Sequence, residues 1–119
     1  MRKDRLLNVA RALRESKNPE DFDMGMYGHA CGTPACALGH YAAREDLQHT
    51  FTLDAVNDSI LVGEDWVGFD SRDVRDHFGI TPSEALELFE AEGCAGAKTA
   101  IEAAEFIERV VAEREAESC

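Results

Sequence analysis

Apolar side chains recur every three or four positions at both ends of the chain, which is the spacing of amphipathic helices. In residues 2–16 the apolar stripe consists of Leu6, Val9, Ala10 and Leu13. In the last helix, which a Thr-Ala-Ile-Glu capping box opens at Thr99, the stripe consists of Ile101, Ala104, Ile107 and Val111. The pattern therefore predicts two long helices, each with one face covering a core.

Three shorter helices are predicted between these two. Thr33 and Pro34 are typical of a helix start, because the hydroxyl can accept from the first free N–H groups and proline suits the first helical position, so a helix is expected over residues 34–45. Ser71 and Gly79 bound a second short helix, near whose end His77 is expected to be a surface histidine that the helix dipole favours. A second capping box, Thr81-Pro82-Ser83-Glu84, opens a third helix that runs to about Ala91.

The stretch from 46 to 69 has a different character. Residues 46–58 contain apolar positions without a clear period and are left unassigned. Residues 59–62 and 66–69 are expected to form a short two-stranded hairpin around a turn at 63–65, and this hairpin would have to lie on the helices, because an isolated hairpin is marginally stable. Trp66, the only tryptophan, is expected to be a packing anchor.

These elements predict a mainly α fold. The chain of 119 residues is long enough for one core and is expected to form a single compact domain, 1–119, of about five helices, to which the pattern allows one short β-hairpin to be added.

Charge is unevenly distributed along the chain. There are 24 Asp and Glu residues against 12 Lys and Arg, so the net charge is −12. The first 17 residues hold six basic residues against Asp4 and Glu15, which makes this segment +4 and the remainder −16. So acidic a chain avoids direct binding to nucleic acid, whereas a partner protein with a basic surface would attract it.

Residues 29–41 contain two of the four cysteines and two of the four histidines. Cys36 and His40 are four residues apart and would share one face of the helix predicted over 34–45, while His29 and Cys31 lie in the segment leading to its start. The four side chains could therefore converge.

Three hypotheses fit this stretch. His29, Cys31, Cys36 and His40 could bind zinc, which takes tetrahedral sets of thiolate and imidazole ligands. Alternatively, Cys31 could be an activated thiol, because a helix N-terminus favours the thiolate, with His29 or His40 as its base. In the third hypothesis both cysteines pack as small apolar side chains.

Two segments carry a resemblance to known proteins, namely Cys31-Gly32-Thr33-Pro34-Ala35-Cys36-Ala37-Leu38-Gly39-His40 and the later Glu84-Ala85-Leu86-Glu87-Leu88-Phe89. The first is similar to the CGTxACxAGH-like core of a family of small bacterial and phage proteins that has no assigned activity, and the chain resembles that family. Members of the family carry an aromatic residue in place of His40, which implies that this histidine is not an obligatory ligand.

The compartment expected for the chain is the cytoplasm. No run of about 18 apolar residues occurs, so a membrane span is not expected, and Asn8 and Arg11 interrupt the only candidate for a signal peptide. In a reducing compartment the cysteines are expected to be thiols or metal ligands rather than disulfides.

The functional prediction is a non-catalytic binding or regulatory protein. The sequence lacks GxGxxG, phosphate-loop, HExxH and GxSxG motifs, and its acidity favours action on a protein partner. If the resemblance to phage proteins holds, inhibition of a host defence system is one concrete form of that role. The alternative is a zinc-binding or thiol-active protein built on Cys31 and Cys36.

Overall fold

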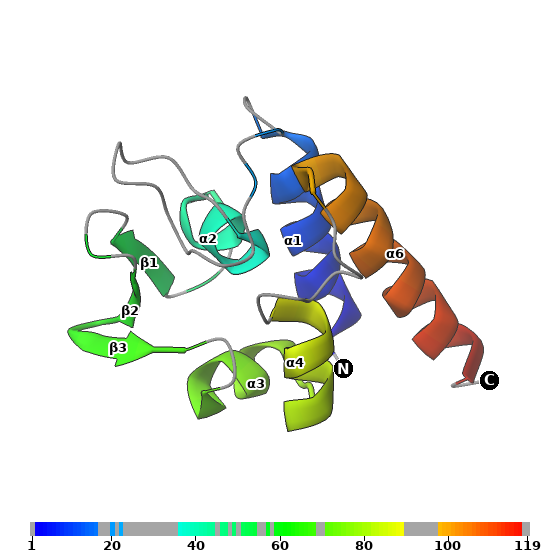
Figure 1. Cartoon of the computed structure of the whole chain (residues 1–119). Helices are drawn as coiled ribbons and strands as arrows, with labels where there is room; N and C mark the ends of the chain where they lie inside the picture. The colour runs from blue at the N-terminus through cyan, green and yellow to red at the C-terminus, as the bar shows by residue number, and fades with distance from the viewer. Residues whose placement is uncertain are drawn as a thin grey trace.

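The computed structural model describes residues 2–16, 20, 22, 36–44, 46–47, 49, 51–54, 57, 59–68, 71–89 and 98–117. Their helices and strands follow the chain in the order α1 (Lys3–Arg14), α2 (Ala37–Ala42), β1 (Phe51–Asp54), β2 (Ser59–Val62), β3 (Asp65–Val67), α3 (Arg72–Phe78), α4 (Pro82–Phe89) and α6 (Ala100–Glu117) (Figure 1). Within these residues, five helices and one small antiparallel sheet confirm the predicted mainly α fold.

The helices α1 and α6 lie side by side and run in opposite directions (Figure 1). The predicted stripe of α1 is buried, and α6 meets it with side chains that are mostly small and fully buried, namely Ala100, Ala103, Ala104 and Ile107. Alanines at these positions let the two helices pack closely. At the rim, the guanidinium of Arg14 donates to both carboxylate oxygens of Glu108, at 2.8 and 2.6 Å.

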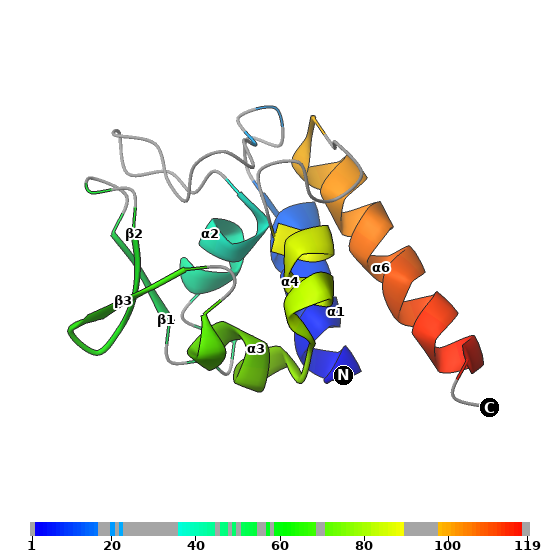
Figure 2. The same cartoon turned by 60° about the horizontal axis from the view of Figure 1, so that its bottom comes forward.

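The short helix α2 lies between α1 and the sheet (Figure 2). All of its side chains are buried. It begins at Ala37 rather than at Pro34, because the backbone of Cys36 is extended (φ −85°, ψ 175°) and forms the N-cap. Thr33 and Pro34 themselves lie outside the described residues.

The capping box predicted at Thr81 is complete, and one of the two hydrogen bonds of the box predicted at Thr99 is present. At the start of α4, the backbone N–H of Thr81 donates to Glu84 Oε1 at 3.0 Å, and the N–H of Glu84 donates back to Thr81 Oγ1 at 3.2 Å. At the start of α6, the N–H of Glu102 donates to Thr99 Oγ1 at 3.2 Å. The end of α3 is also as predicted, because Gly79 adopts the left-handed conformation (φ 63°) in which glycine has no steric penalty.

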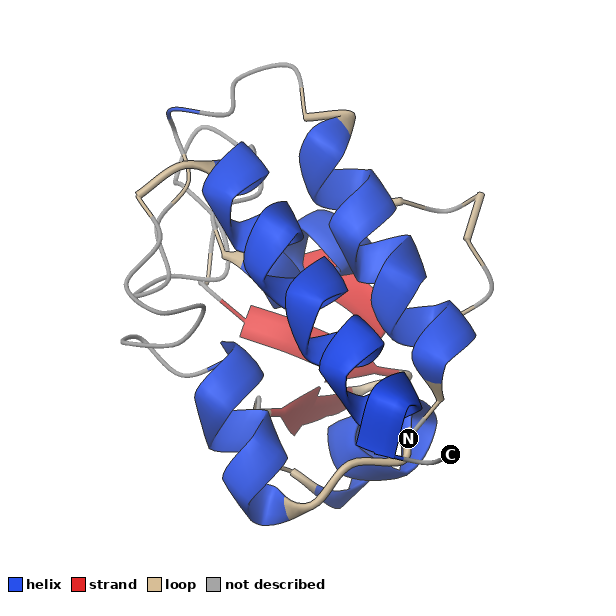
Figure 3. Ribbon diagram, turned by 90° about the vertical axis from the view of Figure 1, so that its right-hand side faces the viewer, coloured by secondary structure: helices blue, strands red, loops and turns tan. Residues whose placement is uncertain are grey.

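The sheet has three antiparallel strands in the order β1-β2-β3, and the helices cover one of its sides (Figure 3). Its first strand falls in the stretch that the hydrophobic pattern left unassigned. The predicted hairpin is formed by β2 and β3, with a turn of two residues, Gly63 and Glu64, instead of three. Gly63 has φ +64°, as the favoured two-residue hairpin turns require at this position.

Trp66 is not the packing anchor that the sequence predicted, because its side chain is 77% exposed. The two-residue turn pairs Ile60 with Val67 and Leu61 with Trp66. Side chains alternate between the faces of a sheet, and Ile60 and Val67 are buried, so Trp66 lies on the opposite, outward face.

Candidate functional site

The described part of the predicted Cys/His site consists of Cys36 and His40, since His29 and Cys31 lie outside the described residues. Cys36 is 2% exposed and caps α2 with its sulfur, which accepts a hydrogen bond from the backbone N–H of Gly39 at 3.3 Å. The sulfur therefore lies at the start of the helix, on the N-cap residue rather than within the helix predicted over 34–45.

His40 is 4% exposed and both of its ring nitrogens contact the protein. Nδ1 lies 2.9 Å from the carbonyl oxygen of Cys36, and Nε2 lies 3.2 Å from the hydroxyl of Ser16, just beyond α1. A carbonyl oxygen only accepts, so in the neutral ring Nδ1 carries the proton and Nε2 accepts from the hydroxyl. His40 thus joins α2 to the end of α1.

The contacts of His40 and Cys36 describe two of the four ligands of the zinc hypothesis. A histidine that donates from Nδ1 to a backbone carbonyl presents Nε2 as a metal ligand, which is a common arrangement in metal sites. For zinc binding, however, Nε2 would have to leave Ser16, and the sulfur of Cys36 would have to leave the N–H of Gly39. Within the described residues, no three His, Cys, Asp or Glu side chains come together as a metal site.

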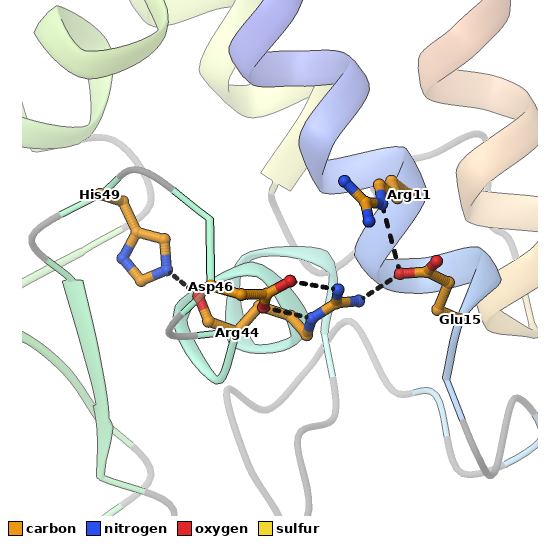
Figure 4. Close-up of polar contacts among 5 residues, drawn as sticks. All are labelled: Arg11, Glu15, Arg44, Asp46 and His49. Atoms are coloured by element: carbon orange, nitrogen blue, oxygen red, sulfur yellow. Dashed lines mark hydrogen bonds and ion pairs between the residues drawn. The ribbon is translucent and has the colours of Figure 1, made fainter.

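A second polar cluster surrounds Arg44, beyond the end of α2 (Figure 4). Its guanidinium donates to both carboxylate oxygens of Asp46, at 2.8 and 2.7 Å, and to Glu15 at 2.6 Å. These hydrogen bonds lower the pKa of Asp46 to about 2 and also lower the pKa of Glu15. Arg11 also forms an ion pair with Glu15, at 3.4 Å. The carbonyl oxygen of Arg44 accepts a hydrogen bond from His49 Nε2 at 2.7 Å. The cluster joins α1 to the segment after α2, so its charges are used inside the fold.

A third cluster, which the sequence did not reveal, is centred on Tyr41 and His77. The hydroxyl of Tyr41 lies 2.8 Å from Nε2 of His77, and the rings of Phe51 and Phe78 pack around both. Arg5 donates to the carbonyl of His77 at 2.7 Å and approaches its Nδ1 at 3.4 Å.

Burial is the main cause of the pKa shifts of Tyr41 and His77. It raises the pKa of Tyr41 to about 12 and, helped by the positive charge of Arg5, lowers the pKa of His77 to about 4. Both side chains are therefore neutral at pH 7. A general acid or base works best with a pKa near the operating pH, so the pair is poorly matched to catalysis at neutrality. The expectation that His77 is a surface histidine at a helix end is wrong.

The sequence contained one indication that His77 lies against the core. His77 lies three residues after Val74 and directly before Phe78, both of which are fully buried, so it borders the apolar stripe of α3. Its partners Arg5 and Tyr41 come from elements that are distant in sequence, and no local pattern indicates them.

The acidic side chains of the fold fall into two groups. Some are paired with arginines of the same chain, namely Arg11, Arg14, Arg44, Arg72 and Arg114. Others are exposed and make no ion pair within the described ranges, namely Asp4, Glu20, Glu64, Asp65, Asp73, Glu102, Glu105 and Glu113. Six of these eight lie on the β2–β3 hairpin, on α3 and along α6, and give these surfaces their negative charge.

Among the helices that the structure describes, none combines the length and the apolar character needed to cross a membrane. The chain matches no protein-family model, no curated protein and no solved structure. What it does must therefore be inferred from its own residues.

Proposed function

We propose that this protein is a non-catalytic binding protein that acts through its acidic surface on a protein partner with a basic surface. The observation that carries the proposal is the division of charge on the described residues. The arginines of the ion pairs are occupied by other carboxylates, whereas the exposed acids on the hairpin, α3 and α6 face water. Negative charge that the fold does not use internally is available to a partner.

The net charge of −12 supports this proposal, because it increases the rate at which the chain associates with a basic partner. A field of one sign accelerates encounters with an oppositely charged surface by about 10-fold to 1,000-fold at low ionic strength. For a protein of a phage or its bacterial host, inhibition of a defence protein that carries a basic, nucleic-acid-binding surface is one concrete form of such binding.

The test is capture of a bacterial protein by the immobilised chain, followed by measurement of the purified complex. Two triple variants each remove three negative charges and therefore have the same net charge as each other. They are Glu64→Gln/Asp65→Asn/Asp73→Asn, on the hairpin and α3, and Glu102→Gln/Glu105→Gln/Glu113→Gln, on α6. We expect the captured protein to bind one of them several-fold more weakly than the other, because a partner contacts one surface. Binding that both variants retain at the wild-type affinity would contradict the proposal.

A second candidate function, a zinc-binding or thiol-active site, is favoured by the state of His40. Its Nδ1 donates to the Cys36 carbonyl, so Nε2, which accepts from Ser16 in this structure, is the nitrogen that would bind a metal after leaving Ser16. His29, Cys31 and Cys36 would supply the remaining ligands. Native mass spectrometry with and without chelator separates the alternatives: a zinc ion retained by wild type and by a Cys119→Ser control, but lost from Cys31→Ser and Cys36→Ser, would establish the site, and a metal-free mass would remove it.

A further inference from the structure

The most exposed large apolar side chain in the described part of the chain is that of Trp66 on β3. It is 77% exposed, against 44% for Leu86 and 42% for Leu7. An indole in water contributes nothing to the core of its own fold, and tryptophan is one of the residue types that are enriched among the residues that dominate binding energy at the centre of interfaces. The position of Trp66 therefore points to a contact with another molecule.

The strand that carries Trp66 is an edge strand. The sheet order is β1-β2-β3, so one side of β3 pairs with β2, and no further described strand lies along its other side. In a hairpin with a two-residue turn, the pair next to the turn, Val62 and Asp65, is hydrogen-bonded, and the next pair, Leu61 and Trp66, is not. The backbone N–H and C=O of Trp66 therefore point away from β2, toward the open edge.

The same hairpin carries unpaired negative charge. Glu64 in the turn and Asp65 at the start of β3 are both exposed, and neither makes an ion pair within the described residues. The three consecutive residues thus combine two carboxylates with an aromatic face. Lysine and arginine are attracted by both features, because the face of an indole binds cations and carboxylates form ion pairs with them.

We propose that the β3 edge of this hairpin binds an extended, arginine- or lysine-containing segment of a partner protein. The segment adds as a fourth strand, and its backbone exchanges hydrogen bonds with the N–H and C=O of Trp66. A basic side chain of the segment lies over the indole on the outward face, a neighbouring one pairs with Asp65 on the opposite face of the strand, and another pairs with Glu64 in the turn. This inference rests on the proposed function and names the surface and the partner chemistry through which it operates.

A second copy of this chain fits the same edge poorly. Pairing two β3 strands would bring the carboxylates of Glu64 and Asp65 close to their own copies, in molecules that each carry a net charge of −12. Like charges placed opposite each other across a strand pair are destabilising. Acidic residues on an edge strand are also a known protection against unwanted pairing, which leaves a basic segment as the occupant that the charges favour.

The experiment uses Trp66 as its own reporter, since it is the only tryptophan in the chain. The full chain is titrated with a synthetic peptide that repeats Arg-Lys-Val, so that basic side chains lie on both of its faces when it is extended. We expect a saturable blue shift of the tryptophan emission that weakens with salt, as the indole becomes covered. An emission that saturating peptide leaves unchanged would overturn the inference.

Variants and modified peptides separate the parts of the proposed contact. By calorimetry, Trp66→Ala is expected to weaken binding by about tenfold, the loss of one buried cation–aromatic contact, whereas Leu86→Ala, at an exposed apolar position on α4, leaves it unchanged. Glu64→Gln/Asp65→Asn should weaken binding several-fold more than the equally charged Glu102→Gln/Glu105→Gln. A peptide with methylated backbone nitrogens should fail to bind, and its binding at full affinity would exclude strand addition.

The captured partner distinguishes failure of this inference from failure of the proposed function. If the Trp66→Ala variant binds the captured partner as tightly as the wild type does, and salt still weakens that binding, the role of the hairpin is overturned. The acidic-surface function then still stands. A chain that binds no partner in a salt-dependent way would contradict both.

Discussion

The neutral His77 in the aromatic cluster makes the stability of this protein dependent on pH. Burial of the ring, followed by the positive charge of Arg5, lowers its pKa to about 4 from the ordinary value of 6.5, with smaller contributions from His49 and Arg2 and an opposing one from Asp4. Between these two values the unfolded chain binds a proton at this position and the folded chain does not. The free energy of unfolding therefore falls as pH is lowered from about 6.5 to about 4.

The size of this effect follows from the two pKa values. Each unit of difference is worth about 1.4 kcal/mol, so the full difference corresponds to about 3 kcal/mol. Because His77 is only half-buried and water screens part of the interaction, we expect a loss of about 1 to 2 kcal/mol. For a protein with a typical stability of about 5–15 kcal/mol, this is a measurable fraction.

Urea unfolding between about pH 7.5 and about pH 4.5 measures this loss. Far-ultraviolet circular dichroism is the suitable signal, because Trp66 is already exposed in the folded state. The matched variant is His77→Gln, whose amide can still reach the hydroxyl of Tyr41 but cannot take up a proton. We expect the wild type to lose stability more steeply than the variant over this range. Parallel profiles for the two proteins would refute the assignment of the pH dependence to His77.

Three further substitutions test the Tyr41–His77 hydrogen bond, the packing of α6 on α1, and the cap of α4. Tyr41→Phe removes the hydroxyl from the nitrogen of its histidine partner and is expected to cost about 1–2 kcal/mol in urea unfolding, and no loss would show that this hydrogen bond is not formed. Ile107→Ala opens a cavity where α6 meets α1 and should cost about 2–5 kcal/mol, whereas a cost below 1 kcal/mol would contradict the packing described for these helices. Thr81→Ala removes the cap of α4 and should cost about 1 kcal/mol by thermal unfolding, with Ser83→Ala in the same turn as a nearly neutral control, and equal effects of the two would argue against the cap.

The parts of the fold that the sequence predicted are those controlled by local rules. The apolar stripes of α1 and α6 and the capping boxes at Thr81 and Thr99 depend on residues three or four positions apart. The α1 stripe and the Thr81 box are present in full, the α6 stripe is buried except for the partly buried Ile101, and the Thr99 box forms one of its two hydrogen bonds. The strand β1 was not recognised, because four residues, one of them exposed and two half-buried, offer too short an alternation to stand out.

The errors concern residues whose surroundings come from distant parts of the chain. His77 is 72 residues from Arg5 and 36 from Tyr41, so the environment that keeps it neutral leaves no local pattern. Trp66 was misplaced because the predicted turn was one residue too long, and a shift of one residue moves a side chain to the other face of a sheet. For the candidate Cys/His site, the contacts of Cys36 and His40 with the other described residues are established, and its completion by His29 and Cys31 stays a prediction.

The central claim, that an exposed acidic surface binds a basic partner, is tested most directly by the salt dependence of that binding. The dissociation constant of the isolated complex is measured by calorimetry from about 0.05 M to about 0.5 M salt, over which the Debye length falls from about 14 Å to about 4 Å. We predict that affinity falls steadily by at least about tenfold over this range, because the attraction between exposed charges is screened. A dissociation constant that stays the same at both ends of the range would contradict the account.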